Sequence, residues 1–434
     1  MRPALHPSTF LDTYAKPMLL RARTVLPVTA PPVDDGAVLI ADGRIVAVGR
    51  WEDLRRGAQG EVVDLGDVIL MPGLINAHCH LDYTNMAGQL PAPRVFTDWI
   101  KQIMTLKSSW TRDDYARSWT NGAGMLLRSG TTTVMDIETM PDLLPDVWST
   151  ASLRMISCAE LISVRSRLAA SEQVAEALAR LSMLSDPLKR VGLAPHAPYS
   201  TNLELLSRAA EAATERSWPI TIHISESQAE FDMFMYRQGP MFDWLKPQRA
   251  MDDCGLGSPV HHAGASGVLG PNCVAAHVNY LWDNDAELLA RSGTHVVHCP
   301  RSHDFFQHQR FPLHRLEAAG VNICLGTDSL ASLGTKRGEI AALNMFSEMR
   351  AFSAMAPLVR PETIVRMATV NGARALGLAG RVGELCVGAA GDLIAVPHFA
   401  GEVDPWEAVV NHRGDVNCSM IDGRWVLNPP ATGG

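Results

Sequence analysis

Four residues from three separate stretches of the sequence have the side chains of a metal site. His78 and His80 form a His-x-His pair, while His223 and Asp328 each stand at the end of an apolar, strand-like run. In an extended strand residues i and i+2 point to the same face, so the pair can converge on one ion. A third imidazole and a carboxylate from distant strands complete a set of nitrogen and oxygen ligands with a position open to water. The sequence therefore predicts one divalent metal bound by these four residues, and the ligand set suits zinc, iron or manganese.

Two further residues are placed to move or orient protons beside that ion. Glu226 lies three residues past His223, just beyond the strand, and its carboxyl can reach a substrate atom. There it would carry a proton from the attacking water to a ring nitrogen of the substrate. A glutamate in such a loop can instead be a charge at the start of a helix, but its offset from His223 favours the catalytic role. His277 ends another apolar run; it could bind the metal, but orienting the water is the preferred role.

Apolar runs alternate with amphipathic stretches through the middle of the chain. Near-continuous apolar strands separated by helices indicate a parallel sheet covered by helices. Eight such units over about 300 residues favour a closed barrel, because an open sheet would need a Gly-rich phosphate loop after its first strand and the sequence has none. The predicted fold is α/β, a (β/α)8 TIM barrel over residues 71–374. The eight predicted strands are Gly73–Ala77, Thr132–Asp136, Met155–Leu161, Val191–Pro195, Ile220–Ile224, Cys273–Ala276, His295–His298 and Ile323–Gly326. Predicted helices include Asp113–Arg128, Gln173–Leu184, Leu203–Arg216 and Ala286–Ser292.

The two ends of the chain have a different pattern. Both are rich in short runs of Val, Ile and Leu, and each contains an Asp-Gly-Arg step, at Asp42-Gly43-Arg44 and at Asp422-Gly423-Arg424. Asp-Gly between apolar runs is a hairpin signal. We therefore predict a small β-sandwich domain built from both termini, residues 1–70 and 375–434, with the barrel inserted between them.

Composition indicates a large globular enzyme. The chain has 434 residues, 47% apolar and 19% charged, with a net charge of −8. This balance argues against disorder and against a nucleic-acid or anionic-membrane partner, and no apolar run is long enough to span a bilayer. The eight cysteines are scattered singly, without CxxC spacing. Reduced, buried thiols and the lack of an apolar secretory segment favour the cytoplasm. The expected partner is a small heteroaromatic substrate, and the sequence leaves open whether the chain forms a homo-oligomer.

Six stretches of the sequence together resemble one family. The chain is similar to the amidohydrolase superfamily, and within it to the branch of aminohydrolases that use a single metal ion. The resemblance implies the barrel, the split β domain, one divalent metal, zinc or iron, and hydrolytic deamination of an aromatic ring, in which activated water attacks a ring carbon and ammonia leaves. It also implies that Asp328 both binds the metal and accepts a proton. The matching stretches are Met71–His80, Ala194–Ser200, His223–Ser227, His298–Ser302, Leu325–Ser329 and Met367–Ala373.

Two stretches point to the substrate class. Phe96–Ile100 and His196–Tyr199 look most like deaminases of 6-aminopurine nucleosides, with aminodeoxyfutalosine, from menaquinone biosynthesis, as the first choice. Adenosylhomocysteine and methylthioadenosine deaminases and the triazine chlorohydrolases share the metal pattern. Many relatives carry Asn after Arg-Ser in the loop after strand 7, where this chain has His303. Arg165 and Arg167 follow strand 3, and one of them is a candidate for a charge-assisted contact with a substrate carboxylate. The predicted substrate-binding residues are Trp99, Glu138, Arg165, His196, Tyr199 and His303.

Other interpretations stay open at this point. A chlorohydrolase, or a deaminase of a free base such as guanine or cytosine, would use the same ligands. Amide- or lactam-ring hydrolases of this fold usually hold two metals bridged by a carbamylated lysine at the end of strand 4, where this chain has His196, so one metal is favoured. A non-catalytic barrel scaffold is disfavoured because all four ligands and Glu226 are present.

Overall fold

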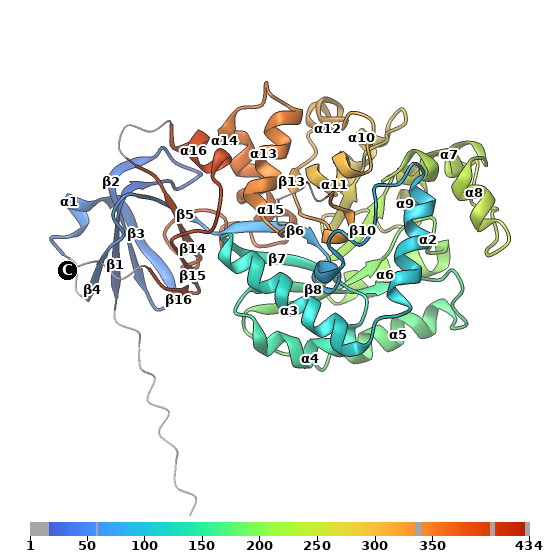
Figure 1. The fold of residues 1–434 in the computed structure, drawn as a ribbon, viewed down its shortest axis with the longest axis horizontal. Coiled ribbons are helices and arrows are strands. Elements are labelled where there is room, and N and C mark those ends of the chain that lie inside the picture. Colours follow the sequence, from blue (N-terminus) through green and yellow to red (C-terminus); the bar gives the residue numbers. More distant parts are fainter. Residues whose placement is uncertain (1–16, 58–59, 335–340, 400–403, 430–434) are drawn as a thin grey trace, which may run out of the picture.

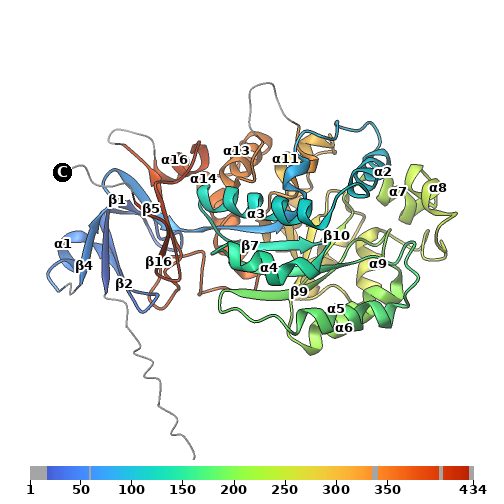
Figure 2. The same ribbon diagram turned by 60° about the horizontal axis from the view of Figure 1, so that its bottom comes forward.

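The computed structural model describes residues 17–57, 60–334, 341–399 and 404–429 of the chain. These residues form two separate sheets. Figure 1 shows the sheet built from the two ends of the chain, coloured blue and red, beside a larger body that holds the middle of the chain. The two parts remain side by side when the molecule is turned in Figure 2.

The larger body is a parallel barrel of eight strands in chain order. Neighbouring strands pair in parallel from β6 to β13. The barrel closes where the backbone N–H groups of Thr327 and Asp328 both donate to the carbonyl of His78, at 3.1 Å each. The predicted barrel is confirmed, and each predicted strand coincides with an observed one to within a few residues. The strands are β6 Leu74–Cys79, β7 Thr131–Glu138, β8 Arg154–Leu161, β9 Lys189–Pro195, β10 Ile220–Ile224, β11 Cys273–His277, β12 His295–His298 and β13 Ile323–Leu325.

Amphipathic helices surround the barrel, as Figure 2 shows for α3 to α6. Several begin at a side chain that accepts a backbone N–H, such as Thr111 before α3 and Asn202 before α6, because the first turn of a helix leaves its N–H groups unpaired. The helices of the barrel region are α2 Phe96–Lys107, α3 Arg112–Arg128, α4 Leu144–Val147, α5 Ala170–Leu181, α6 Leu203–Glu215, α7 Gln228–Tyr236, α8 Pro240–Leu245, α9 Pro259–Ala265, α10 Asp285–Ser292, α11 Pro300–Phe305, α12 Leu313–Ala319, α13 Met345–Met355, α14 Pro361–Met367 and α15 Val370–Ala375. Short 3-10 helices are η1 Leu81–Met86, η2 Pro141–Leu143, η3 Trp148–Thr150 and η4 Leu330–Ser332.

The smaller sheet joins strands from both ends of the chain, as predicted. Its order is β16-β15-β14-β5-β1-β2-β3, and β4 also pairs with β1. Strand β14 runs antiparallel to β5, which ties the two ends together. The strands are β1 Met18–Val25, β2 Val33–Ala41, β3 Arg44–Arg50, β4 Glu61–Asp64, β5 Val68–Pro72, β14 Leu393–Pro397, β15 Cys418–Ile421 and β16 Arg424–Leu427. Two further helices in these terminal segments are α1 Trp51–Leu54 and α16 Pro405–Asn411.

The two Asp-Gly steps form the predicted hairpin turns and lie against each other. Asp42 and Gly43 connect β2 to β3, and Asp422 and Gly423 connect β15 to β16. All four residues have positive φ, from 51° to 73°, as type I′ turns require. A Cβ atom on Gly423 would lie 2.7 Å from Cα of Gly43. Glycine is therefore needed here both for the turn and for the close approach of two segments that are far apart in sequence.

A buried ion pair fastens the barrel to the C-terminal segment. The guanidinium of Arg154, at the start of β8, donates to both carboxylate oxygens of Asp392 at 2.9 and 3.0 Å. The chain passes from the terminal sheet into the barrel between Pro72 and Leu74, and it returns to the sheet at Leu393. The predicted domain limits at residues 70 and 375 stay a prediction. Among the described residues, no helix has both the length and the apolar character needed to cross a bilayer.

Candidate metal centre and active site

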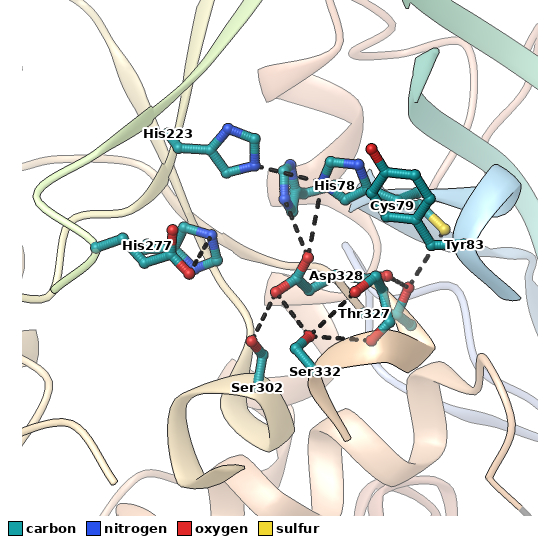
Figure 3. A network of polar contacts seen from close by, with 12 residues as sticks. His78, Cys79, Tyr83, His223, His277, Ser302, Thr327, Asp328 and Ser332 are labelled. Carbon is teal, nitrogen blue, oxygen red and sulfur yellow. Dashed lines mark hydrogen bonds and ion pairs between the residues drawn. The ribbon is translucent and has the colours of Figure 1, made fainter. Parts of the chain in front are cut away.

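Three histidines and an aspartate meet at the carboxyl ends of the barrel strands. His78 lies in β6 and His80 follows that strand, His223 lies in β10, and Asp328 follows β13. Nε2 of His80 is 3.3 Å from Nε2 of His223. Nε2 of His78 and Nε2 of His80 each lie 3.7 Å from Oδ1 of Asp328. The fold thus gathers the four residues predicted as metal ligands, and Figure 3 shows His78 and His223 beside Asp328.

A break in the register of β6 helps to turn its histidines toward the site. Asn76 pairs with Val134 of β7, but Cys79 pairs with Asp136, so β6 holds one extra residue between these pairs. Ile75, before the break, and Ala77, within it, pack inside the barrel. Bulges of this kind re-aim side chains next to active sites. His78 and His80 can therefore face the site, although the alternate residues Ile75 and Ala77 of the same strand fill the barrel interior.

The ring nitrogens of this cluster fit a bound cation. Both ring nitrogens of His78 and Nδ1 of His80 are buried without a hydrogen-bond partner among the described residues. Nδ1 of His223 lies 2.7 Å from the carbonyl oxygen of His196. A carbonyl only accepts, so Nδ1 carries the hydrogen and Nε2 keeps its lone pair. Burial lowers the pKa of His80 well below its ordinary value and that of His223 to about 4. Both imidazoles are then neutral, which is the form that binds metal.

Asp328 divides its two oxygens between the cluster and a pair of hydroxyls. Ser302 donates to Oδ2 at 2.6 Å and Ser332 at 3.1 Å, while Oδ1 faces His78 and His80. Burial by itself raises the pKa of Asp328, but the nearby imidazoles, that of His78 above all, outweigh it, so the net pKa lies well below the usual range. The carboxylate is therefore ionised. Its φ of 53° is rare for a residue other than glycine and is typical of functional sites.

Glu226 and His277 form the other half of the site. Nε2 of His277 lies 3.7 Å from Oε1 of Glu226, and ligand atoms of these two residues and Asp328 lie within 4.8 Å of one another. Burial, with the charges of Asp328 and Glu230, raises the pKa of Glu226 well above its ordinary value. Burial lowers the pKa of His277 well below its own. Both shifts favour the uncharged forms, a protonated carboxyl and a neutral imidazole, over an ion pair.

A cavity of about 350 Å³ opens above these residues. Its inner end contains His80, His223, His277, Glu226 and Asp328. Aromatic and aliphatic side chains make up most of the remaining wall. Of the residues predicted to contact the substrate, Trp99, Arg165, His196 and Tyr199 line this cavity.

Glu138 and His303 are not among the residues that line the cavity. Met135 and Ile137 of β7 point into the barrel interior, so by alternation Glu138 points outward, where Trp119 Nε1 lies 3.4 Å from its Oε1. Nδ1 of His303 lies 3.1 Å from Oδ1 of Asn279, and its ring helps to line a separate cavity of about 270 Å³. For both residues the geometry gives no support to the predicted substrate contact.

Some residues of the site were given no role in the sequence analysis. Ser302 and Ser332 orient Asp328, and Tyr83 stacks on His80 with ring centroids 5.3 Å apart. Lys107 and Glu160 also line the cavity. Glu160 stands near the end of a predicted strand in the phase of Ile156 and Cys158, but only the structure shows that this phase points inward. Ser302 ends one of the stretches that resemble the family, and no sequence signal marks Ser332, Tyr83 or Lys107.

Comparison with known proteins identifies the family. A model of the amidohydrolase family matches residues 69–426, most of the chain. The chain belongs to the amidohydrolase family. A short match to an imidazolonepropionase-like composite domain of bacteria covers residues 36–57, in the terminal sheet. The resemblance found in the sequence is confirmed, and the amidohydrolase is a metal-dependent hydrolase that acts on carbon–nitrogen bonds other than peptide bonds.

Named relatives and solved structures cover nearly the whole amidohydrolase. It is 33% identical over 420 residues to a protein of Syntrophobacter fumaroxidans named 5-methylthioadenosine/S-adenosylhomocysteine deaminase, covering 91% of this chain and 88% of the relative. An adenosine deaminase structure from Xanthomonas campestris with bound zinc has a TM-score of 0.82 and 28% identity, covering 94% and 92% of the two chains. Aminofutalosine deaminase of Helicobacter pylori also has a TM-score of 0.82, covering 94% and 100% of the chains, but its 19% identity shows a shared fold alone.

Proposed function

We propose that this amidohydrolase is a hydrolytic deaminase of 6-aminopurine nucleosides. The observation that carries the proposal is that Glu226, His277 and Asp328 meet in the wall of the cavity with their ligand atoms within 4.8 Å of one another. Their pKa values are shifted in opposite directions, because burial raises the pKa of Glu226 while the pKa of Asp328 lies below its usual range. One group can accept a proton and the other can donate one. The names of the relatives, deaminases of adenosine-type nucleosides, agree with this chemistry.

His78, His80, His223 and Asp328 would hold one divalent ion, zinc or iron. A bound ion of this kind supplies a nucleophilic water at neutral pH. Two residues of the chain, Asp328 and Glu226, then transfer the protons. Asp328 accepts a proton from the water as its oxygen bonds to the amino-bearing ring carbon, and Glu226 donates its proton to the adjacent ring nitrogen. Passage of a proton from Asp328 to the amino group lets that group leave as ammonia. The remaining hydroxyl proton passes to Glu226, which restores its carboxyl and leaves the oxygen on the ring carbon as a carbonyl.

The cavity wall suits a flat heteroaromatic base. Trp99 and Tyr199 offer ring faces, and His196 offers an imidazole whose Nδ1 is held by Ser200 Oγ at 2.6 Å. Aromatic faces bind a purine by stacking, while the edge groups set its orientation. The same wall keeps bulk water away from the reacting carbon. The predicted contacts of Trp99, His196 and Tyr199 with the base thus form part of the proposal.

The group at the sugar 5′ position would lie toward the cavity mouth. Ile103, Met104 and Val164 give that part of the cavity an apolar wall, which accommodates a thioether or an aryl group. Arg165 also lines the cavity and donates from Nε to Gln248 Oε1 at 2.6 Å. Aminodeoxyfutalosine carries a carboxylate that Arg165 could contact, whereas methylthioadenosine carries none. These two nucleosides are the substrates to separate.

Ammonia release together with metal analysis tests the proposed function. The purified protein should contain close to one zinc or iron per chain and should release ammonia from aminodeoxyfutalosine or methylthioadenosine. Arg165→Ala should lower kcat/KM for aminodeoxyfutalosine only, and Arg167→Ala is the matched control because Arg167 does not line the cavity. If the nucleosides are inert while guanine, cytosine or a chlorinated triazine reacts, the nucleoside proposal is wrong and only the metal-hydrolase family remains.

A further inference from the structure

Two opposite charges line the cavity away from the metal-binding cluster. Lys107 stands at the end of α2, and Glu160 lies near the end of β8. Ile156 and Cys158 of the same strand point into the barrel interior, so Glu160, two residues further on, points to the same side and reaches the cavity floor. Both side chains are partly exposed to the cavity. Neither residue takes part in the proton transfers described above.

The two charges do not neutralise each other by direct contact. Lys107 Nζ donates to the hydroxyl of Tyr83, and Glu160 accepts no hydrogen bond from any described residue. The charge of Lys107 nevertheless acts on Glu160: burial raises the pKa of this carboxyl, and Lys107 opposes the rise. A partly desolvated carboxyl without a partner is costly. The pair therefore offers a donor and an acceptor to a group that enters between them.

The distance from the reaction centre limits which part of a substrate can reach this pair. The ring of Tyr83 stacks on His80 with centroids 5.3 Å apart, and Lys107 Nζ lies 4.7 Å from the Tyr83 centroid. Adding 5.3 and 4.7 Å gives about 10 Å as the upper limit between Nζ and the His80 ring. The purine ring and the glycosidic bond fit within this limit, so Lys107 is near enough to the reaction centre to contact the sugar. A charged group at the end of a long 5′ chain would lie farther out.

We propose that Lys107 and Glu160 bind the 2′- and 3′-hydroxyls of the substrate sugar and so select ribonucleosides over deoxyribonucleosides. This inference rests on the proposed function. A vicinal diol can accept from the ammonium of Lys107 and donate to the carboxylate of Glu160 at the same time. A hydroxyl can also form a hydrogen bond with Glu160 when this carboxyl is protonated. A substrate ammonium would pair less well with that uncharged form. The apolar wall beyond the pair is then left for the 5′ group.

The test compares the sugar preference of the wild type with that of variants. For a 5′ derivative that is deaminated, kcat/KM is measured for the ribose, 2′-deoxy and 3′-deoxy forms. The wild type should prefer the ribose form by about 10–100-fold, because each lost hydrogen bond to a charged group costs about 1.5–3 kcal/mol. Lys107→Met and Glu160→Gln should each lose most of this preference by slowing the ribose form, with little change for the deoxy form that lacks their partner hydroxyl.

Lys101→Met is the matched control on the same helix. Lys101 is exposed, pairs with Asp98 at 3.1 Å and does not line the cavity, so this variant should keep the wild-type preference. Thermal unfolding checks that all three variants fold.

Three results would overturn the sugar site. An equal kcat/KM for the ribose and deoxy forms in the wild type would show that the enzyme does not recognise the sugar hydroxyls. An equal loss for both forms in Lys107→Met and in Glu160→Gln would mean that these residues only support Tyr83 and the local fold. A complete lack of nucleoside turnover, with deamination of a free base, overturns the proposed function and the sugar site together, and so is distinct from the first two results.

Discussion

Ser302 holds the carboxylate of Asp328 in place: its hydroxyl donates to Oδ2 at 2.6 Å while Oδ1 faces the histidines. Ser302 stands at the start of α11 and Asp328 just past β13, so the contact joins two neighbouring units of the barrel. The hydroxyl thereby determines which oxygen is presented to the cluster. It also stabilises the ionised form of Asp328, because a hydroxyl donates a strong hydrogen bond to a carboxylate.

Ser302→Ala should weaken metal binding by about 10–100-fold, because groups that orient a ligand carry this share of the affinity. The fold should persist, since Ser332 still donates to Oδ2 at 3.1 Å. Competition with a chromophoric chelator measures the affinity. Ser149→Ala is the control, because Ser149 is exposed and bonds only the carbonyl of Asp146. Equal affinities in the two variants would show that Ser302 has no orienting role.

Glu226→Gln should keep the metal content and reduce ammonia release by about 10²–10⁴-fold, the usual worth of a positioned acid–base group. The amide is close in shape to the protonated carboxyl but cannot deliver an acidic proton to the ring nitrogen. Glu172→Gln, in the first turn of α5, is the control. Near-normal turnover by Glu226→Gln would assign the proton transfer to another group, with His277 as the next to test.

The stability of the protein should fall as the pH drops below about 6.5, in part because of His298. Its side chain is buried and stacks on Phe311 with centroids 3.9 Å apart, and burial, with the charges of His303 and His308, lowers its pKa well below 6.5. The unfolded chain takes up a proton near pH 6.5 that the native chain does not, so falling pH favours unfolding by up to about 1.4 kcal/mol per unit.

His298→Gln should therefore flatten the pH dependence of the free energy of unfolding between pH 5 and 6.5. Denaturant titrations at several pH values measure it. His314→Gln is the matched control, since the side chain of His314 is 75% exposed and should leave the slope unchanged. A slope in His298→Gln as steep as in the wild type would mean that His298 does not remain neutral in the folded protein.

Arg154→Ala should lower the free energy of unfolding by about 3–5 kcal/mol, because it leaves the buried charge of Asp392 without its partner. Arg180→Ala, which breaks only exposed ion pairs, should cost less than about 1 kcal/mol. Replacement of both Arg154 and Asp392 by leucine should cost less than the sum of the single losses, because no charge is then left buried. If the losses of unfolding free energy in the two single variants simply add in the double variant, the ion pair does not link the barrel to the C-terminal segment energetically.

Strand positions and the gathering of the metal-site residues could be predicted from sequence. Residues that end apolar runs, such as His223, must come together at one rim once parallel strands close into a barrel. The Asp-Gly turns could be predicted as well, because their backbone conformation is local. Their contact with each other could not, since Gly43 and Gly423 are brought together only by the pairing of the two chain ends.

The sequence by itself determined which residue types stand at the strand ends and thus the chemistry available to the site: imidazoles and carboxyl groups that can bind a metal and move protons. Only the tertiary structure decided which side chains face the cavity. Glu138 and Glu160 both stand near the end of a strand, yet only Glu160 lines the cavity. The reason is that alternation along a strand tells only which side chains share a face. Which of the two faces points into the barrel depends on how the neighbouring strands pack. Lys107 and Glu160 line the same cavity only because the fold brings the end of α2 to the end of β8, and such long-range arrangements leave no local pattern in the sequence.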